Sequence, residues 1–344
     1  MKITQAMIAK RLGVCQSTVS QALSETGYSA IPHITRERIV RVARELGYQR
    51  LPSYARQPMG KTKNIAFLVP EDFQGEELEI YTRRFYAGVL RELDTYGYHL
   101  VQAIAHADEE LPDVVRDGDL AGVIYEDRCD PDLVQRIQAR MPIVLLNNQF
   151  DTVDVDSVMP DNAGGYWKAI HHLYQLGHRR IALFGMYPPM IHLPERIDAY
   201  RNSLIRLDLP IQEDYITIAE PQIPHSLEDV AACAKRTLQE WMRLATPPTA
   251  AMCINDLFAL YLLHAAREMG IAVPEDFSVI GFDNLPSCEH TVPRLTSIDQ
   301  PMEEMGRYAC KLLLEQIDGC VRPVSKVRVG LRLVHRGSTG PTSG

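Results

Sequence analysis

The sequence has 344 residues and a formal net charge of −8, with 46% hydrophobic and 23% charged residues. This length exceeds what one hydrophobic core usually serves, so two or three domains are expected. The composition is typical of a soluble globular protein, and no apolar run approaches the roughly 18 residues of a membrane helix. Since Met1 does not open a signal-peptide pattern, we expect a cytoplasmic protein. The seven cysteines are scattered singly, which indicates reduced thiols and no zinc or redox pair.

The charge is divided unevenly along the chain. Residues 1–63 hold 11 Lys and Arg against three acids, a net of +8. The remainder holds 25 bases against 41 acids, a net of −16. A basic head on an acidic body is the expected pattern when only the head meets nucleic-acid phosphates.

Residues 8–23, IAKRLGVCQSTVSQAL, predict a helix, a glycine turn and a second helix. Ile8, Ala9 and Leu12 have the spacing of one helical face. Gly13 then ends that helix, because glycine adopts the left-handed conformation without strain. The exposed face of the second helix carries short side chains suited to base edges and phosphates, at Gln16, Ser17, Thr18, Ser20 and Gln21. This is a helix-turn-helix pattern, although an αα-corner with a solvated face remains the alternative on pattern alone.

A third helix completes the small all-α head that we place at residues 1–49. Thr35 is a good N-cap for it, and Leu46 is its last apolar position before Gly47. Residues 50–63 then form a linker by composition, with two prolines, one glycine and four bases.

From residue 64 onward, apolar runs of strand length alternate with amphipathic helices. This rhythm predicts an α/β core over residues 64–338 with parallel sheets covered on both faces. Two series of similar size imply two lobes with a cleft between them. We place the first lobe at about 64–159 and 293–322, and the second at about 160–292 and 323–338. Residues 327–336 alternate like a closing hairpin, and the tail 339–344 is expected to be disordered.

With these residues considered together, the chain resembles the lac-repressor family of bacterial transcription regulators over nearly its whole length. In the head, the family pattern is matched by Ile8-Ala9, Leu12-Gly13-Val14-Cys15 and Thr18-Val19-Ser20, and ELGYQ follows at 45–49. In the body, seven segments follow the family's order and spacing: DSVMPDNAGG, HLYQLGHRRIALFG, ERIDAYRNSL, PPTAAMCIND, MGIAVPEDFSVIGFDN, PRLTSIDQP and MGRYACKLLL. Seven such segments behind a helix-turn-helix form a specific match.

The resemblance implies a DNA-binding head, a hinge, and a core like that of the periplasmic sugar-binding proteins. It also implies a homodimer that binds near-palindromic double-stranded operator DNA. A small polar effector in the cleft, a sugar or sugar derivative, would change operator affinity. The expected function is therefore that of a sequence-specific transcriptional repressor.

Carried onto this sequence, the base-reading positions of the family are Gln16, Ser17 and Gln21, with Thr18 and Ser20 directed toward phosphate. Cys15 departs from the serine usual there, and sulfur is a poor acceptor for a helix cap. The hinge also departs from the family. Its implied DNA contacts are Tyr54, Ala55, Pro58 and Met59. Either Pro58 or Met59 would be the residue inserted into the minor groove, depending on the alignment.

The effector contacts of the family lie at the carboxyl ends of strands, where open α/β sheets bind ligands. The matched positions are Glu71, Asp72, Asn147, Asp161, Arg196, Asn255, Asp256, Asp283 and Gln300. Carboxylates, amides and one arginine suit a ligand dense in hydroxyl groups. Other roles compete at several of these positions, because Asp161 and Asp256 also read as helix N-caps and Arg196 as an ion-pair residue.

No catalytic function is expected, since the sequence contains no P-loop, GxGxxG or GxSxG motif and no recognisable pair of nucleophile and base. No cofactor or metal is expected either. His171, His172 and His178 lack partner carboxylates at ligand spacing. The alternative function is a DNA-binding regulator gated mainly by a protein partner, with a vestigial effector cleft.

Overall fold

The computed structural model describes residues 5–14, 18, 19, 22, 33–46, 62–71, 76–106, 110–186, 193–219 and 227–342. The chain divides into two compact units, Met1–Gly60 and Lys61–Gly344. The division falls inside the linker expected at 50–63. Each unit has its own hydrophobic core.

The small unit contains α1 (Gln5–Leu12) and α3 (His33–Glu45), with Thr18, Val19 and Ala22 also in helical conformation. Gly13 has a φ of 67° and follows α1, as its left-handed turn requires. The core of this unit joins α1, the second helical segment and α3 through Ile8, Ala9, Val19, Ala22, Ile39, Val42 and Ala43. The helix α3 begins two residues before Thr35, so Thr35 lies in its first turn rather than at its cap.

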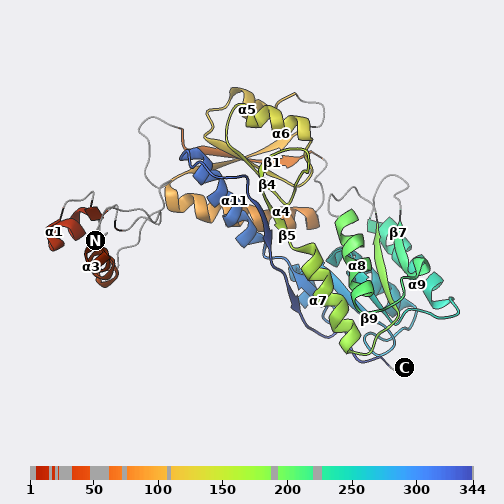
Figure 1. The fold of residues 1–344 in the computed structure, drawn as a ribbon. Helices are drawn as coiled ribbons and strands as arrows, with labels where there is room; N and C mark the ends of the chain where they lie inside the picture. Colours follow the sequence, from red (N-terminus) through yellow and green to blue (C-terminus); the bar gives the residue numbers. More distant parts are fainter. Residues whose placement is uncertain are drawn as a thin grey trace. The chain divides into compact units, whose positions relative to one another are not determined.

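The large unit contains two six-stranded sheets, which confirms the α/β fold with parallel sheets (Figure 1). The first sheet has the order β11-β5-β4-β3-β1-β2. Its strands are β1 (Asn64–Pro70), β2 (His99–Ala105), β3 (Gly122–Glu126), β4 (Ile143–Leu146), β5 (Asp156–Pro160) and β11 (Lys326–Val329). All its pairings are parallel, with Ile65 beside Gly122 and Glu126 beside Leu146.

The second sheet has the order β12-β10-β9-β8-β6-β7. Its strands are β6 (Ile181–Met186), β7 (Ile216–Ala219), β8 (Ala250–Cys253), β9 (Ser278–Asp283), β10 (Thr296–Asp299) and β12 (Arg332–Val334). They run parallel except β12, which pairs with β10 in the antiparallel sense. We call each sheet with its covering helices a lobe.

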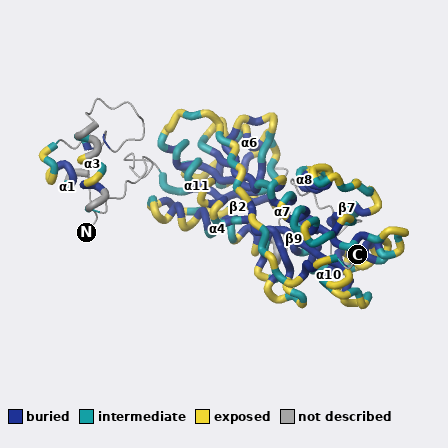
Figure 2. Tube along the Cα trace, turned by 60° about the horizontal axis from the view of Figure 1, so that its bottom comes forward, coloured by how far each residue is buried: buried dark blue, intermediate teal, exposed yellow. Residues whose placement is uncertain are grey.

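The helices of the first lobe are α4 (Glu76–Tyr96), α5 (Asp113–Asp117), α6 (Pro131–Gln138) and α11 (Met302–Ile317). Those of the second lobe are α7 (Asn162–Gln175), α8 (Leu193–Arg206), α9 (Leu227–Met242) and α10 (Asp256–Glu268), with short 3-10 turns η2 (Glu213–Tyr215) and η3 (Pro286–Glu289). The strands of both sheets are almost wholly buried, except the edge strands (Figure 2). This explains why they read as continuous apolar runs.

Three crossovers connect the lobes, and they correct the expected lobe boundaries. The chain passes between the sheets after β5, after β10 and between β11 and β12. Residues 296–299 therefore belong to the second lobe and 326–329 to the first, the reverse of the expectation. The hairpin expected at 327–336 is also wrong, because its two halves join different sheets. Alternation along a strand predicts its buried face but does not tell which sheet receives it.

The carboxyl-terminal segment is packed rather than disordered through residue 342. Ser338 is fully buried, and its hydroxyl accepts from Thr296 N at 2.8 Å and donates to Val279 O at 2.6 Å. His178 Nε2 lies 3.0 Å from Gly340 O, and Thr342 N donates to Leu176 O. These polar residues are retained in the core because each has buried partners, which composition alone cannot indicate.

Candidate functional site

Three polar side chains from distant parts of the sequence meet where strands β4 and β10 end. Tyr81 lies on α4, Asn147 directly follows β4, and Gln300 directly follows β10. The Tyr81 hydroxyl accepts hydrogen bonds from Asn147 Nδ2 and from Gln300 Nε2, each at 3.0 Å. All three side chains are buried, and Asn147 has a φ of 60°. One phenol therefore fixes the orientation of two amides.

Glu126 is the last residue of β3, and it is completely buried. The register places it beside Leu146, the residue before Asn147. Its Oε1 accepts from Thr82 Oγ1 at 3.5 Å, a weak contact. Burial, with the Asp127 carboxylate nearby, raises the pKa of Glu126 well above its usual value. We call Tyr81, Glu126, Asn147 and Gln300 the first-lobe wall, in which Gln300 comes from the crossover that leads from β10 to α11.

The first-lobe wall leaves three buried acceptors without donors. Glu126 Oε2, Asn147 Oδ1 and Gln300 Oε1 have no hydrogen-bond partner among the described residues. Leaving one such group unpaired costs on the order of 1–3 kcal/mol. Three such acceptors together at the ends of parallel strands mark this place as a candidate ligand site.

The second lobe contributes a buried guanidinium. Arg196 on α8 is fully buried and stacks 3.9 Å over the Phe282 ring. Its Nε donates to Asn162 Oδ1 at 3.2 Å, its Nη1 donates to Ile254 O, and its Nη2 lies 3.7 Å from Asp283 Oδ1. Nη2 has no hydrogen-bond partner within the described chain. We call Arg196, Asp283 and Asn162 the second-lobe wall.

Charged groups of the second-lobe wall act electrostatically on Tyr81 of the first-lobe wall. Burial raises the pKa of Tyr81 well above its usual value, the Asp283 carboxylate raises it further, and Arg196 lowers it. Groups can act on Tyr81 in this way only when they are close to it through a medium of low dielectric constant. The two walls are therefore close to each other at the carboxyl ends of both sheets, where parallel α/β folds bind ligands.

The remaining predicted effector residues that the structure describes have partners within the chain. Asp161 caps α7 by accepting from Gly164 N at 2.9 Å, and Asn255 caps α10 by accepting from Phe258 N at 3.1 Å. Glu71 is exposed and pairs with His106 Nδ1 at 3.0 Å. Asp72 lies outside the described residues.

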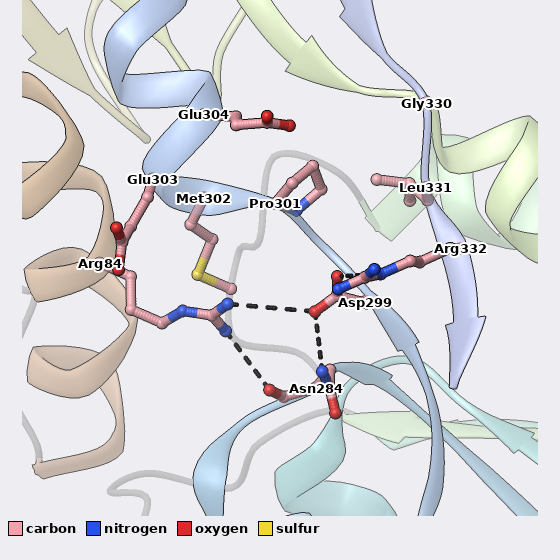
Figure 3. Close-up of a pocket in the computed structure, with 10 residues that line it drawn as sticks. All are labelled: Arg84, Asn284, Asp299, Pro301, Met302, Glu303, Glu304, Gly330, Leu331 and Arg332. Carbon is pink, nitrogen blue, oxygen red and sulfur yellow. Dashed lines mark hydrogen bonds and ion pairs between the residues drawn. The ribbon is translucent and has the colours of Figure 1, made fainter. Parts of the chain in front are cut away.

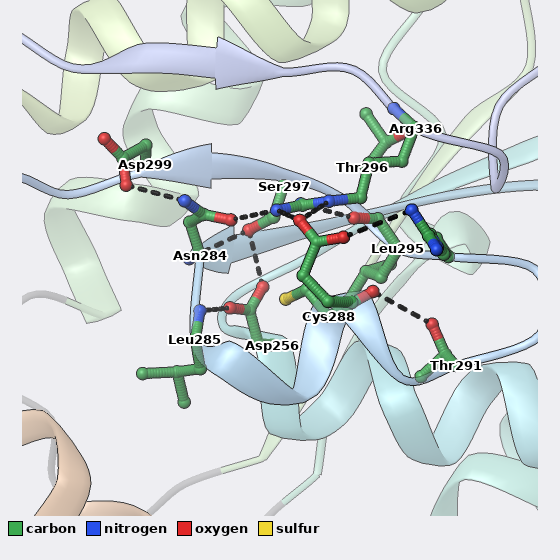
Figure 4. Close-up of polar contacts among 12 residues, drawn as sticks. Asp256, Asn284, Leu285, Cys288, Thr291, Leu295, Thr296, Ser297, Asp299 and Arg336 are labelled. Atoms are coloured by element: carbon green, nitrogen blue, oxygen red, sulfur yellow. Dashed lines mark hydrogen bonds and ion pairs between the residues drawn. The ribbon is translucent and has the colours of Figure 1, made fainter.

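Asp256 is fully engaged inside the second lobe (Figure 4). Its Oδ1 accepts from Ser297 Oγ at 2.6 Å and its Oδ2 accepts from Leu285 N at 2.7 Å. Burial raises the pKa of Asp256 to about 6, while these two hydrogen bonds lower it. Both oxygens are used to hold neighbouring segments, so Asp256 is not among the residues that we propose for the ligand. We call Asp256, Leu285 and Ser297 the Asp256 cluster.

A cavity of about 520 Å³ lies beside the crossovers, and three of the charged side chains that line it, Arg84, Asp299 and Arg332, are paired (Figure 3). Arg84 of α4 donates to the carbonyls of Asp283 and Asn284 at 3.4 and 3.3 Å. Asp299 accepts from Asn284 Nδ2 at 2.8 Å and from Arg332 Nε at 2.9 Å. Arg84 thus connects the first lobe to the carboxyl end of β9. Asp283, the last residue of this strand, has a φ of 111°.

Most of the predicted DNA contacts lie outside the described residues, namely Gln16, Ser17, Ser20, Gln21, Tyr54, Ala55, Pro58 and Met59. Thr18 is helical and half-buried. It directly precedes Val19, which is buried in the core of the small unit.

The histidines have structural partners. His178 lies 2.8 Å from Thr249 Oγ1, and His172 Nε2 lies 3.1 Å from Thr339 Oγ1. Among the described residues, no group of three His, Cys, Asp or Glu is placed to hold a metal ion. None of the described helices is long and apolar enough to cross a membrane.

Sequence reasoning missed Tyr81, Glu126 and Asn162. Glu126 had a usable signal, because an acid at the end of an otherwise apolar strand lies where parallel sheets bind ligands. Asn162 follows the N-cap Asp161 and resembled an ordinary first helical residue. Tyr81 had no usable sequence signal, since one tyrosine on an amphipathic helix is normally part of the core.

Comparisons with known proteins agree with this architecture. A family model described as a periplasmic binding protein-like domain matches residues 170–339. The transcriptional regulator reg1 of Streptomyces lividans is 30% identical, over 98% of this chain and 97% of its own length. The transcriptional repressor CytR of Escherichia coli is 28% identical, over 98% of this chain and 96% of its own length.

Solved structures show the same fold. The complex of the regulator CelR with cellobiose has a TM-score of 0.70 at 27% identity, covering 98% of this chain and all of the other. A LacI-family regulator from Enterococcus faecium with bound ribose has a TM-score of 0.68 at 26% identity, covering 81% of this chain and 99% of the other. The helix-turn-helix residues, the two-lobed core and these relatives together place the chain in the LacI family of DNA-binding transcriptional regulators.

Proposed function

We propose that this regulator is a repressor whose operator affinity is set by a small polyhydroxylated ligand, a sugar or sugar derivative, bound between the two walls. The observation that carries the proposal is the set of three unpaired buried acceptors, together with the unpaired Nη2 of Arg196. A sugar hydroxyl both donates and accepts, so several of them serve both walls at once. Relatives bound to cellobiose and ribose support this ligand class.

In this proposal the ligand acts by favouring one arrangement of the lobes. Its affinity must differ between arrangements, because a ligand with equal affinity for both shifts nothing. Arg84 is placed to transmit the change, since it bonds the carbonyl of Asp283, whose side chain faces the ligand.

A homodimer on a near-palindromic operator completes the proposal. Exposed apolar side chains on α4 and the edge strand β2 support it, namely Ile80, Leu90, Val101 and Ile104, which are 41%, 43%, 37% and 51% exposed. Exposed apolar side chains beside an unpaired strand edge are typical of a protein interface. Sedimentation at several concentrations tests it, and a monomer at the concentration that saturates the operator would contradict it.

Within the head, Gln16, Ser17 and Gln21 are proposed to read bases and Thr18 and Ser20 to contact phosphate. We expect Gln21→Ala to reduce discrimination at one base pair of each half-site by about 1–3 kcal/mol. Binding measured on operators substituted at each position checks this. Equal weakening on every operator would contradict the assignment of Gln21.

The central test combines operator binding with ligand titration. Operators are first selected from genomic fragments by the purified full-length protein. Fluorescence anisotropy then measures operator affinity while cellobiose, ribose and other sugars are added, with isothermal titration of the same sugars. Binding of a sugar that changes operator affinity supports the proposal, and Arg196→Lys should weaken it by about tenfold or more.

The alternative, gating by a protein partner with a vestigial cleft, has no observation in its favour. A cleft without a ligand has no reason to retain three unpaired acceptors, because their replacement by apolar groups would be neutral or stabilising. If none of the sugars tested binds, the proposal is overturned in favour of this alternative.

A further inference from the structure

We propose that the first-lobe wall recognises an amino group, so that the effector is an amino sugar or a related polyhydroxylated amine and not a phosphorylated or carboxylated sugar. This inference rests on the proposed function, since it concerns the ligand of the same cleft. It specifies the chemistry that the cleft selects.

The first argument is the balance of donors and acceptors on the wall. Asn147 and Gln300 both direct their amide NH₂ groups to the Tyr81 hydroxyl, so their carbonyl oxygens are left for the ligand. Glu126 Oε2 adds a third acceptor. A protonated amine supplies three donors and no lone pair, whereas each hydroxyl supplies one donor. Three unpaired acceptors therefore fit an ammonium group better than they fit a single hydroxyl.

The second argument is charge. Glu126 is fully buried, and among the described groups no cation lowers its pKa. The guanidinium of the facing wall, Arg196, already lies 3.7 Å from Asp283. An isolated buried carboxylate is costly, and a cationic partner removes most of that cost. A ligand ammonium is the partner that this carboxylate lacks.

The third argument concerns anionic ligands. Phosphate and carboxylate groups need several donors, and arginine forks are the usual source. An anion at the first-lobe wall would instead meet three oxygen acceptors, one of which belongs to the Glu126 carboxyl.

Proton linkage follows from the same geometry. Burial raises the pKa of Glu126, with a contribution from Asp127 and an opposing one from Thr82. The carboxyl therefore holds a proton in the empty site to a higher pH than usual. An arriving ammonium favours the ionised carboxyl and releases that proton, so amine affinity rises with pH until the amine itself loses its charge. A neutral sugar shows no such linkage.

The experiment uses the full-length protein and matched probes that differ at one group. D-glucosamine, D-glucose and D-glucose 6-phosphate form one series, and the corresponding galactose compounds form a second. Thermal shift ranks the probes, isothermal titration in buffers of different ionisation enthalpy measures proton release, and anisotropy measures operator affinity. We expect the amine of a series to bind about tenfold more tightly than its neutral counterpart. The phosphate should be weakest, and proton release should accompany the amine alone.

Variants separate this recognition from general effects. Glu126→Gln should remove both the preference for the amine over the neutral sugar and the proton release. Asp132→Asn removes an exposed charge from α6 in the same lobe, and it should preserve both.

The outcomes distinguish this inference from the proposed function. If a neutral or phosphorylated sugar binds more tightly than its amine and still changes operator affinity, the amino-group inference is overturned and the sugar-controlled repressor stands. If the amine preference survives Glu126→Gln, the wall assignment is overturned. If neither these probes nor cellobiose and ribose bind, both proposals fail.

Discussion

The first-lobe wall and the Asp256 cluster are both buried, both contain a carboxyl group, and both lie near the ends of parallel strands. They differ in how far their hydrogen bonds are satisfied. Both oxygens of Asp256 accept short hydrogen bonds from the protein itself, at 2.6 and 2.7 Å. In the wall, Glu126 has one weak contact at 3.5 Å and one oxygen without a partner in the described chain.

The comparison teaches that position at a strand end does not by itself identify a ligand contact. A satisfied polar cluster stabilises the fold, since each partner would otherwise be buried unpaired. An unsatisfied one reduces stability and persists where a ligand completes it. The cavity beside the crossovers belongs to the first kind, because Arg84, Arg332 and Asp299 are bonded to one another or to the chain.

The largest expected effect separates the two clusters by stability. Asp256→Ala leaves Leu285 N and Ser297 Oγ without their acceptor, and we expect the free energy of unfolding to fall by about 3–5 kcal/mol. Glu126→Gln removes a poorly paired buried acid and should change it by less than about 1 kcal/mol. Urea denaturation near neutral pH measures both. Similar losses of unfolding free energy in the two variants would show that the two clusters do not differ in how far they stabilise the fold.

A second prediction concerns the packed carboxyl-terminal segment, which is also satisfied. Ser338→Ala removes the acceptor of Thr296 N and the donor to Val279 O, so we expect a loss of about 2 kcal/mol in unfolding free energy. Thermal or urea unfolding provides the measurement. An unchanged midpoint would show that this segment does not contribute to the core.

A third prediction separates ligand affinity from stability within the wall. Asn147 has a φ of 60°, which glycine adopts without strain, so Asn147→Gly should reduce sugar affinity by about tenfold with little loss of stability. Asn147→Ala should reduce affinity equally and also lower stability by about 1 kcal/mol, because alanine is strained at that φ. Sugar titration and urea denaturation of both variants provide the two measurements. Retained affinity in both variants would remove Asn147 from the site.

The smallest expected effect depends on pH. Burial, with His335 and His178 nearby, lowers the pKa of His172 to about 4, whereas an unfolded histidine titrates near 6.5. A depressed folded pKa means that the stability is complete above pH 6.5 and is lost as the pH falls through 4. We expect His172→Gln to flatten the fall in unfolding free energy across this window. A fall identical to that of the wild type would contradict the assignment.

Several features followed from the sequence alone because local chemistry specifies them. The alternation of apolar runs and amphipathic helices predicts parallel sheets, since strands buried on both faces need apolar side chains throughout. Gly13 marks a left-handed turn, and Asp161 reads as an N-cap from its position before a helix. The family motifs extended these local signals to the whole chain and identified a two-lobed regulator.

Other features were decided by tertiary structure. Strand pattern does not record which sheet accepts a strand, so the sequence places β10 and β11 in the wrong lobes. It also predicts a disordered tail, because the buried partners of the tail come from distant segments. Glu126 ends β3 and Asp256 follows β8 closely, and only the positions of Ser297, Leu285 and Thr82 distinguish the two acids. Hydrogen-bond satisfaction depends on atoms brought together from distant segments, and it exists only once the chain has folded.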